Sequence, residues 1–512
     1  MHKFILSSTE SQEIYGKEVK QIGDGTCSVV YKTDKSAAVK VFIAEICTQV
    51  PEVAILKKLN HSNILKPLCV NLANHEYITK SYDLEWIDEH TRDSYKQDWI
   101  YSSYCKYGIK MYMPLADMTL YTFPEEQMKN IAIRKNIYKQ LLQAVSYCHA
   151  NDVWHTDIKP MNILIFSPLN STNLFEGTVK LADFSASISY ARVSNNNTFD
   201  IQTLQYRSPE IVLKYRLYDE RIDLWSVGVI MWEYMNHTDL SLANMFCCDS
   251  SNHLLDVIIK LIGYPTKWLD GVSKLNMDFK KLSKYDSTMK KHNMLSESYD
   301  TQESDLISHL LTWPNKRYSA CEALAHPYFS DIPTPIEISN TMPVEIDAEM
   351  NTNNDWFDRI KIKRKEAILK MHHLMSSDLK YSSRFHSYVL FDLFAAKSRH
   401  FSSSNEDQIP AYLFACMIIS SQLLEHLLFI DMDDKRNPTD KYTTAKYINH
   451  ILEVMEFDII FDTTWSILQK KGDYLKLNII LLNIIIEQLQ TLENQSVLEL
   501  VREHFEKVGH PL

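Results

Sequence analysis

Residues 155–164 read HTDIKPMNIL and place three polar side chains, Asp157, Lys159 and Asn162, between two hydrophobic runs. A fourth, Asp183, follows within the segment LADFS. Each has an ordinary explanation by itself, since Asn162 could cap a helix and Asp183 could end a strand. Together they suit phosphoryl transfer, which needs a base near the accepting hydroxyl, a cation on the phosphate and oxygen ligands for Mg²⁺.

A phosphate-binding segment precedes this loop. IGDGTCSVVYK, residues 22–32, places Gly23 and Gly25 between two predicted strands, where bare backbone can approach phosphate oxygens. A GxG pattern alone is more often a hairpin turn. Lys40 follows in the apolar segment AAVKVF, and Glu52 lies on the next predicted helix. We expect Glu52 to pair with Lys40 and so to hold the lysine toward the α- and β-phosphates.

The motifs and their order resemble the eukaryotic-type protein kinases of the serine/threonine class across residues 14–330. TLQYRSPE, residues 203–210, resembles the corresponding segment of the proline-directed group. IGDGTCSVVYK, LKKLNHSNIL and QLLQAVSYCHANDVWH resemble the cyclin-dependent kinases. The resemblance implies an α+β bilobal protein kinase fold, with a strand-rich N-lobe at residues 14–115 and a helical C-lobe at residues 116–330.

The same resemblance implies ATP and Mg²⁺ as cofactors and gives each catalytic side chain a role. Asp157 would accept the proton of the substrate hydroxyl, and Lys159 would neutralise the γ-phosphate. Asn162 and Asp183 would bind the metal. Asp223 would brace the catalytic loop, residues 155–162, and Arg317 would pair with Glu210 farther along the chain; both are expected to stabilise the C-lobe.

The nucleotide would lie against the N-lobe. By the resemblance, Met113 is the gatekeeper residue, and the backbone of Pro114 and Ala116 meets adenine. The nucleotide-binding residues implied are Ile22, Gly23, Gly25, Val30, Ala38, Lys40, Glu52, Met113 and Ala116.

Three positions differ from the cyclin-dependent kinases because each lacks an arginine. In that family an activation-loop threonine, here Thr198, is phosphorylated and three arginines bind the phosphate. This chain has Thr156, Pro51 and Ile188 at the three arginine positions. A phosphate at Thr198 would add nearly two negative charges with no cation at those positions. We therefore expect activity without that phosphate; the competing interpretation is an inactive kinase.

Further departures affect the phosphate loop and the helix that carries Glu52. Ser28 and Ser185 replace glycines of the family pattern, and Cys27 replaces the inhibitory tyrosine that follows Thr26. Pro51 suits the first turn of a helix, which predicts that Glu52 lies near the start of a short helix. A separate cellular cyclin is then not expected to recognise this rewritten segment.

The remaining chain predicts a linker and a helical domain. An N-terminal extension, residues 1–13, and an insertion at about residues 73–103 complete the kinase region, and residues 331–362 form the linker. Residues 363–470 have helical periodicity and resemble a cyclin box, although its usual Lys–Glu pair falls on Gln422 and Ile448. Residues 471–512 predict further C-terminal helices, too few for a second box.

Composition narrows the partners. The 512 residues carry a formal net charge of −11, which argues against binding to nucleic acid or to an anionic membrane. The most apolar segment is too short and too interrupted to span a membrane. Scattered cysteines indicate reduced thiols and a cytoplasmic location, in the host cell if the protein is viral, with the nucleus left open by KIKRK at residues 361–365. Kinase–cyclin fusions of this kind resemble proteins of giant DNA viruses.

These observations predict an ATP-dependent serine/threonine kinase that is directed to Ser/Thr-Pro sites in protein substrates. Its own cyclin-like domain would activate it in cis, without activation-loop phosphorylation. Two alternatives stay open. One is a pseudokinase scaffold that binds ATP and recruits partners through the helical domain, and the other is an active kinase whose C-terminal domain only docks substrates.

Overall fold

The computed structural model describes most of the first 331 residues and parts of the C-terminal region. The described residues are 4–25, 28–42, 46–74, 107–166, 177–189, 201–236, 240–269, 277–286, 301–331, 367–368, 386–388, 390–391, 394–395, 398, 406–425, 438–439 and 441–456. Outside them lie Thr26, Cys27, Thr198, residues 471–512, and most of both the expected insertion and the expected linker.

The N-lobe is built on a five-stranded antiparallel sheet with the order β1-β2-β3-β5-β4. Its strands are β1 (Glu18–Gly25), β2 (Ser28–Thr33), β3 (Ala37–Phe42), β4 (Cys69–Asn74) and β5 (Tyr107–Pro114). The first three follow the strand, turn, strand, strand pattern predicted from the sequence. Alternation along the central strand β3 gives the sheet two apolar faces, because every residue of β3 is buried.

The N-terminal segment covers one of those faces. Helix α1 (Ser8–Tyr15) begins at a capping box formed by Ser7 and Glu10. The residues before it extend along β4, since the Leu6 amide donates to the Val70 carbonyl at 3.0 Å. Leu6 and Tyr15 then pack on a cluster from the outer face, which contains Val39, Val41, Cys69 and Tyr112. The opposite face of the sheet is therefore the one left for the cleft.

Helix α2 (Ile46–Lys58) carries Glu52 and corrects one expectation. Pro51 lies inside the helix, beyond its first turn, so the prediction that Glu52 lies near the start of a short helix is wrong. Proline there removes the hydrogen bond that its amide would make to the carbonyl of Cys47. The residues from Val50 to Leu56 are all buried, and this packing outweighs the backbone cost. Glu52 consequently lies in the middle of the helix, not near its start.

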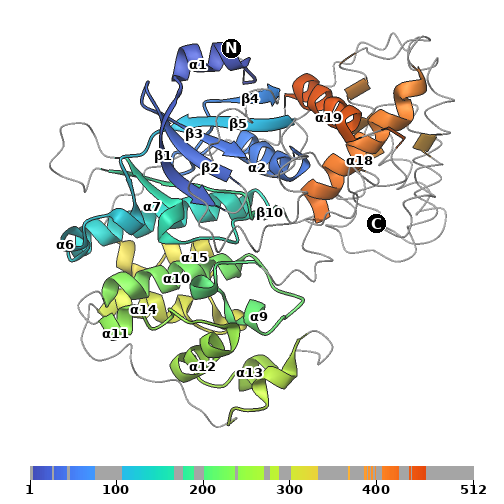
Figure 1. The fold of residues 1–512 in the computed structure, drawn as a ribbon. Helices are drawn as coiled ribbons and strands as arrows, with labels where there is room; N and C mark the ends of the chain where they lie inside the picture. Colours follow the sequence, from blue (N-terminus) through green and yellow to red (C-terminus); the bar gives the residue numbers. More distant parts are fainter. Residues whose placement is uncertain are drawn as a thin grey trace, which may run out of the picture.

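The C-lobe is helical, with small sheets at its junction with the N-lobe (Figure 1). Two-stranded and three-stranded sheets have the orders β10-β7 and β6-β8-β9. Their strands are β6 (Met118–Thr119), β7 (Val153–Trp154), β8 (Ile163–Phe166), β9 (Thr178–Leu181) and β10 (Ile188–Ser189). The helices are α6 (Glu125–Met128), α7 (Ile131–Ala150), α9 (Pro209–Val212), α10 (Arg221–Met235), α11 (Leu240–Ala243), α12 (Ser251–Ile262), α13 (Thr266–Leu269), α14 (Thr301–Leu310) and α15 (Ala320–Leu324). Short 3₁₀ helices are η1 (Leu120–Thr122), η2 (Pro160–Asn162), η4 (Leu204–Tyr206), η6 (Phe279–Leu282), η8 (Pro314–Lys316) and η9 (Pro327–Phe329).

Helix α10 is the central helix of this lobe and is buried along most of its length. A side chain at Gly228 would place its Cβ 2.9 Å from atoms of Leu310 and Leu311, so glycine permits the close approach of α14. The helix thereby fixes Asp223, in its first turn, beneath the catalytic loop. In the parts of the chain that the structure describes, no helix is long and apolar enough to cross a membrane.

The described C-terminal residues are helical and lie beside the N-lobe (Figure 1). Helix α18 (Ile409–Glu425) follows η10 (Glu406–Gln408) and packs on α19 (Lys441–Met455). Helix α18 also contacts α2 and β10, and α19 contacts β5. Lys57 of α2 donates a hydrogen bond to the carbonyl of Glu456, just after α19. The C-terminal helices therefore touch the helix that carries Glu52 and the strand that follows Asp183.

Candidate active site

The catalytic loop lies between β7 and β8 and is closed by η2. Lys159 Nζ donates to Asp157 Oδ2 at 2.7 Å, and the Thr203 hydroxyl donates to Asp157 Oδ1 at 2.6 Å. The Asn162 amide nitrogen donates to the Asp157 carbonyl at 2.8 Å. This use of the nitrogen leaves the amide oxygen of Asn162 as the atom able to bind a hard cation.

Asp223 holds the loop from below. Its two carboxylate oxygens accept from the amides of His155 and Thr156, both at 2.8 Å, and Oδ2 also lies 2.9 Å from His149 Nε2. Asp223 is fully buried. Charge-assisted hydrogen bonds from a buried carboxylate are short and strong. The brace expected at Asp223 is therefore present, and it fixes the backbone on the N-terminal side of Asp157.

Lys40, Glu52 and Asp183 meet between the lobes. Lys40 Nζ lies 2.7 Å from Glu52 Oε1 and 2.7 Å from Asp183 Oδ1. Burial alone would lower the pKa of Lys40, but the two carboxylates outweigh it and raise that pKa. Burial would likewise raise the pKa of Asp183, whereas the ion pair with Lys40 lowers it well below its ordinary value. Both groups therefore stay charged at neutral pH.

The residues around Asp183 fix its orientation. The Ser185 hydroxyl donates to Asp183 Oδ1 at 2.8 Å, the same oxygen that Lys40 contacts. Phe184 is fully buried and packs edge-on against the His155 ring, with centroids 4.8 Å apart. Asp183 itself has a φ of +62°, in the left-handed region. These contacts engage one carboxylate oxygen and leave the other as a ligand for a metal.

The predicted nucleotide-binding side chains line one face of the N-lobe sheet. Gly23 pairs with Val30, and Val30 pairs with Lys40, in adjacent strands. Ala38 pairs with Met113, and Lys40 and Ala38 share a face because they are two residues apart. Gly25 pairs with Ser28 at the end of β1, and Ile22 is 46% exposed. Pro114 is the last residue of β5 that pairs with β3. The backbone from there toward Ala116 therefore extends beyond the pairing with β3.

The activation segment adds Gln202, whose role sequence reasoning missed. Gln202 has a φ of +62°, and its carbonyl accepts from Arg207 Nη2 at 3.0 Å. Its buried side chain donates to the Ser226 hydroxyl at 3.0 Å and accepts from the Ser208 amide at 2.9 Å. The sequence reasoning also missed the contact of Thr203 with Asp157. The sequence signal available for Gln202 and Thr203 was their position directly before LQYRSPE.

The three positions that lack arginine are all buried. Thr156 is 0% and Ile188 2% exposed, and Pro51 lies within the buried part of α2. The remaining structural pair expected from the sequence is present, since Arg317 Nη2 lies 3.0 Å from Glu210 Oε2 and both side chains are buried. Gln422 lies in α18, and Ile448 is fully buried in α19.

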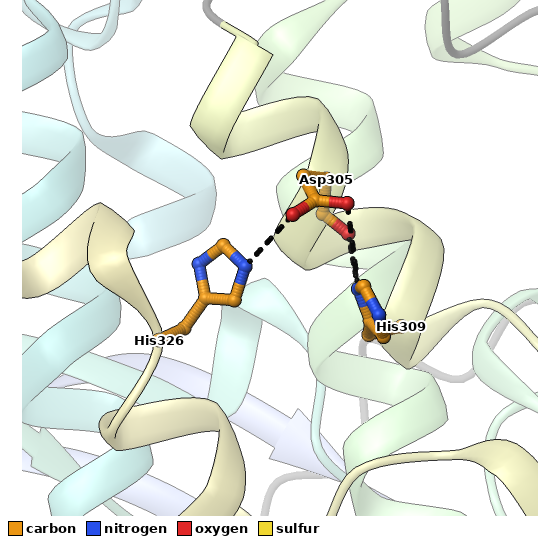
Figure 2. A group of neighbouring side chains, drawn as sticks. All are labelled: Asp305, His309 and His326. Atoms are coloured by element: carbon orange, nitrogen blue, oxygen red, sulfur yellow. Dashed lines mark hydrogen bonds and ion pairs between the residues drawn. The ribbon is translucent and has the colours of Figure 1, made fainter.

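A second group of titratable side chains lies elsewhere in the C-lobe. The ligand atoms of Asp305, His309 and His326 lie within 4.8 Å of one another (Figure 2). His309 Nδ1 lies 2.8 Å from the Asp305 carbonyl, and His326 Nε2 lies 3.2 Å from Asp305 Oδ2. The Tyr328 amide donates to His326 Nδ1. Both ring nitrogens of His326 therefore take part in hydrogen bonds, Nε2 as a donor to the carboxylate and Nδ1 as an acceptor. The group ties α14 to η9.

Comparison with known proteins agrees with this geometry. The family model for the protein kinase domain matches residues 17–329, more than half of the chain. Cyclin-dependent kinase F-3 of Oryza sativa subsp. japonica is 29% identical over 350 residues, which cover 64% of this chain and 69% of that relative. The chain therefore belongs to the protein kinase family and is a protein serine/threonine kinase that uses ATP and Mg²⁺.

Proposed function

We propose that this kinase transfers the γ-phosphate of ATP to Ser/Thr-Pro sites and that its own C-terminal helical domain keeps it active. The observation that carries the proposal is the Lys40–Glu52–Asp183 contact, together with the packing of α18 on the helix that carries Glu52. Asp157 accepts the proton of the substrate hydroxyl, and Lys159 lies beside it to neutralise the transferred phosphate.

ATP and Mg²⁺ fit the side chains at this place. Lys40 supplies a buried cation for the α- and β-phosphates, fixed by Glu52. Asp183 and Asn162 each keep one oxygen uncommitted to the contacts described above, and hard oxygen ligands suit Mg²⁺. When bound, the metal neutralises the charge that develops on the phosphates. Val30, Ala38 and Met113 give adenine an apolar surface on the same face of the sheet.

The backbone at Gln202 supports the proposed preference for proline. Arg207 binds the Gln202 carbonyl, which is therefore unable to accept a hydrogen bond from the residue that follows the substrate hydroxyl. Any residue other than proline would bury an unpaired amide there, which costs free energy. Proline has no amide hydrogen and loses nothing. Buried contacts of the Gln202 side chain hold this conformation.

A peptide library with the acceptor serine fixed tests this preference. We expect the wild type to select proline at the following position at least tenfold over alanine. In Arg207→Ala the carbonyl becomes free, so the selection is expected to weaken while transfer to serine persists. Equal use of proline and alanine by the wild type would contradict the proposal.

The burial of α2 supports the proposed activation in cis. A helix at a lobe surface normally exposes one side, yet the residues from Val50 to Leu56 are all buried. Helix α18 supplies this cover. A cyclin-like domain in this place would stabilise the state in which Glu52 reaches Lys40, because it contacts the helix that carries Glu52.

The residues at the three arginine positions support the proposed independence from a phosphate at Thr198. The phosphate would need cationic partners, and at the three family positions the chain has buried, uncharged Thr156, Ile188 and Pro51. Thr198→Ala is therefore expected to retain activity within a few-fold of the wild type. Complete loss of activity in that variant would refute this part of the proposal.

Phosphate transfer from ATP to a Ser-Pro peptide, without an added cyclin, tests activation in cis. We compare the full chain, a 1–335 truncation and the full chain with Asp183→Asn, and measure ATP binding for each. Activity only in the full wild-type chain supports the proposal. Equal activity in a truncation that binds ATP would show that the helical domain has another role, such as docking substrates. No activity in any of them, with ATP bound, would support a scaffold.

A further inference from the structure

Two buried hydroxyl groups join the catalytic loop to the start of the activation segment. The Thr156 hydroxyl donates to the Ala186 carbonyl at 2.7 Å, and the Ser187 hydroxyl donates to the His155 carbonyl at 3.2 Å. Both residues are 0% exposed. The two hydrogen bonds run in opposite directions between residues 155–156 and residues 186–187. Each segment therefore supplies one hydroxyl donor and one carbonyl acceptor to the other.

The backbone around these residues is held on both sides. Ile188 pairs with Trp154 and Ser189 pairs with Val153, so β10 and β7 continue the contact. The Thr156 amide donates to Asp223, as described above. Thr156 has a φ of +60°, a conformation that a β-branched residue rarely adopts unless its surroundings impose it. Threonine therefore occupies a strained backbone position at residue 156, and its hydroxyl is hydrogen-bonded inside the protein.

We propose that Thr156 and Ser187 form a hydroxyl clasp that does in this chain what a phosphate bound by arginines does in its relatives. The clasp, defined as the Thr156–Ala186 and Ser187–His155 hydrogen bonds, sets the position of Asp183 relative to Asp157. Ala186 lies three residues after Asp183, and Thr156 directly precedes Asp157. Both are positioning residues, because neither contacts the reacting atoms. The inference rests on the proposed independence from a phosphate at Thr198.

A neutral clasp differs from a phosphate in a way that can be measured. It is complete as soon as the chain folds, since both donors and both acceptors belong to the polypeptide. It is buried and carries no net charge, so salt screens it little. Loss of one hydroxyl leaves a buried carbonyl without its hydrogen-bond donor. The free-energy cost of that loss destabilises the native arrangement of the two segments. The expected defect is therefore in the rate of transfer, with ATP affinity nearly unchanged.

The test compares Thr156→Val, which keeps the shape and removes the hydroxyl, with Thr156→Ser, which keeps the hydroxyl. In the full chain we expect Thr156→Val to lower kcat about tenfold and leave the Kd for ATP within twofold. Thr156→Ser is expected to keep kcat within twofold of the wild type. Ser187→Ala is expected to lower kcat severalfold. The double variant Thr156→Val with Ser187→Ala should lose less than the product of the single losses, because the two bonds act as a unit.

Each variant is also measured with Thr198→Ala. If Thr198→Ala alone abolishes activity, the proposed independence from phosphate fails, and the clasp is overturned as a substitute for it. If Thr198→Ala is active, equal kcat values for Thr156→Val and the wild type would overturn the clasp. So would a loss in Thr156→Ser equal to that in Thr156→Val, which would assign the effect to shape and not to the hydroxyl. Thermal unfolding identifies a misfolded Thr156→Val, in which case Ser187→Ala decides: an unchanged kcat overturns the clasp.

Discussion

Replacing Ile418 of α18 with aspartate tests whether this helix controls the kinase. Tyr412 and Ser420 of α18 face the C-terminal domain, since they contact His450 and His386 through hydrogen bonds of 2.7 and 2.9 Å. With 3.6 residues per turn, Ile418 lies on roughly the opposite side of the helix. It is fully buried, and α18 packs on α2. We therefore infer that Ile418 belongs to the contact with the kinase.

The magnitude follows from burial. Losing a buried isoleucine costs about 1.5–3 kcal/mol, and leaving a carboxylate buried without a partner costs several kcal/mol more. We take ~4 kcal/mol as the loss for the closed state, in which Glu52 pairs with Lys40. If closed molecules outnumber open ones by about 99 to 1, a preference of ~2.7 kcal/mol, the variant is closed in only about one molecule in ten. Activity should fall about tenfold.

The assay is the initial rate of phosphate transfer to a Ser-Pro peptide at saturating ATP. Amide hydrogen exchange of α2 is measured in parallel and should become faster in Ile418→Asp. Lys446→Asp is the matched control, because Lys446 is exposed on α19 of the same domain, and its rate should stay within twofold. Wild-type activity in Ile418→Asp, with the protection of α2 unchanged, would refute the reasoning.

Three further predictions concern stability and metal use. Burial raises the pKa of Glu233 to about 7, so the folded state holds this proton more tightly than the unfolded state does. The contribution of Glu233 to the free energy of unfolding is complete below pH ~4.5 and is lost as the pH rises to about 7, and the free energy of unfolding falls by up to about 1.4 kcal/mol per pH unit in this window. In urea unfolding, Glu233→Gln should remove this pH dependence. Identical pH dependence in the variant and the wild type would contradict the assignment. Ser185→Ala removes a donor that orients Asp183, and the Mg²⁺ concentration for half-maximal activity should rise about threefold; an unchanged titration would show that the hydroxyl is dispensable. Arg317→Met leaves Glu210 charged and buried, and the free energy of unfolding should fall by about 3–5 kcal/mol; a loss under 1 kcal/mol would show that the site relaxes.

The kinase fold could be predicted because its signals are local. Alternation in AAVKVF places Lys40 and Ala38 on one face of a strand, and the structure pairs those residues with Val30 and Met113. The motif around Asp157 indicated the catalytic side chains through its residue types and their spacing, and the resemblance to protein kinases implied their roles. The position of Pro51 within α2 could not be predicted, because the rule for proline at helix starts describes local preference and burial overrode it.

Contacts between distant segments were the part that sequence could not supply. Thr203 and Asp157 are 46 residues apart, and although Thr203 stands directly before LQYRSPE, its position alone does not indicate that the two side chains meet. The burial of the Ser187 hydroxyl could not be predicted either, because a serine after a strand-ending motif is most often solvated. Its burial against the His155 carbonyl depends on β10 pairing with β7, a long-range register that only the fold determines.

The departures at Thr156, Ile188 and Pro51 share one physical consequence. Each replaces a long cation with a buried, uncharged side chain, so none can respond to a phosphate that is added or removed. Under the proposed function, control then depends on the packing of α18 on α2. The sequence predicts a linker of about thirty residues, and a linker of that length would give an effective concentration on the order of millimolar, so we expect even a weak contact with α18 to be maintained. If the proposed function holds, the activity of this kinase should follow the integrity of the contact between α18 and α2.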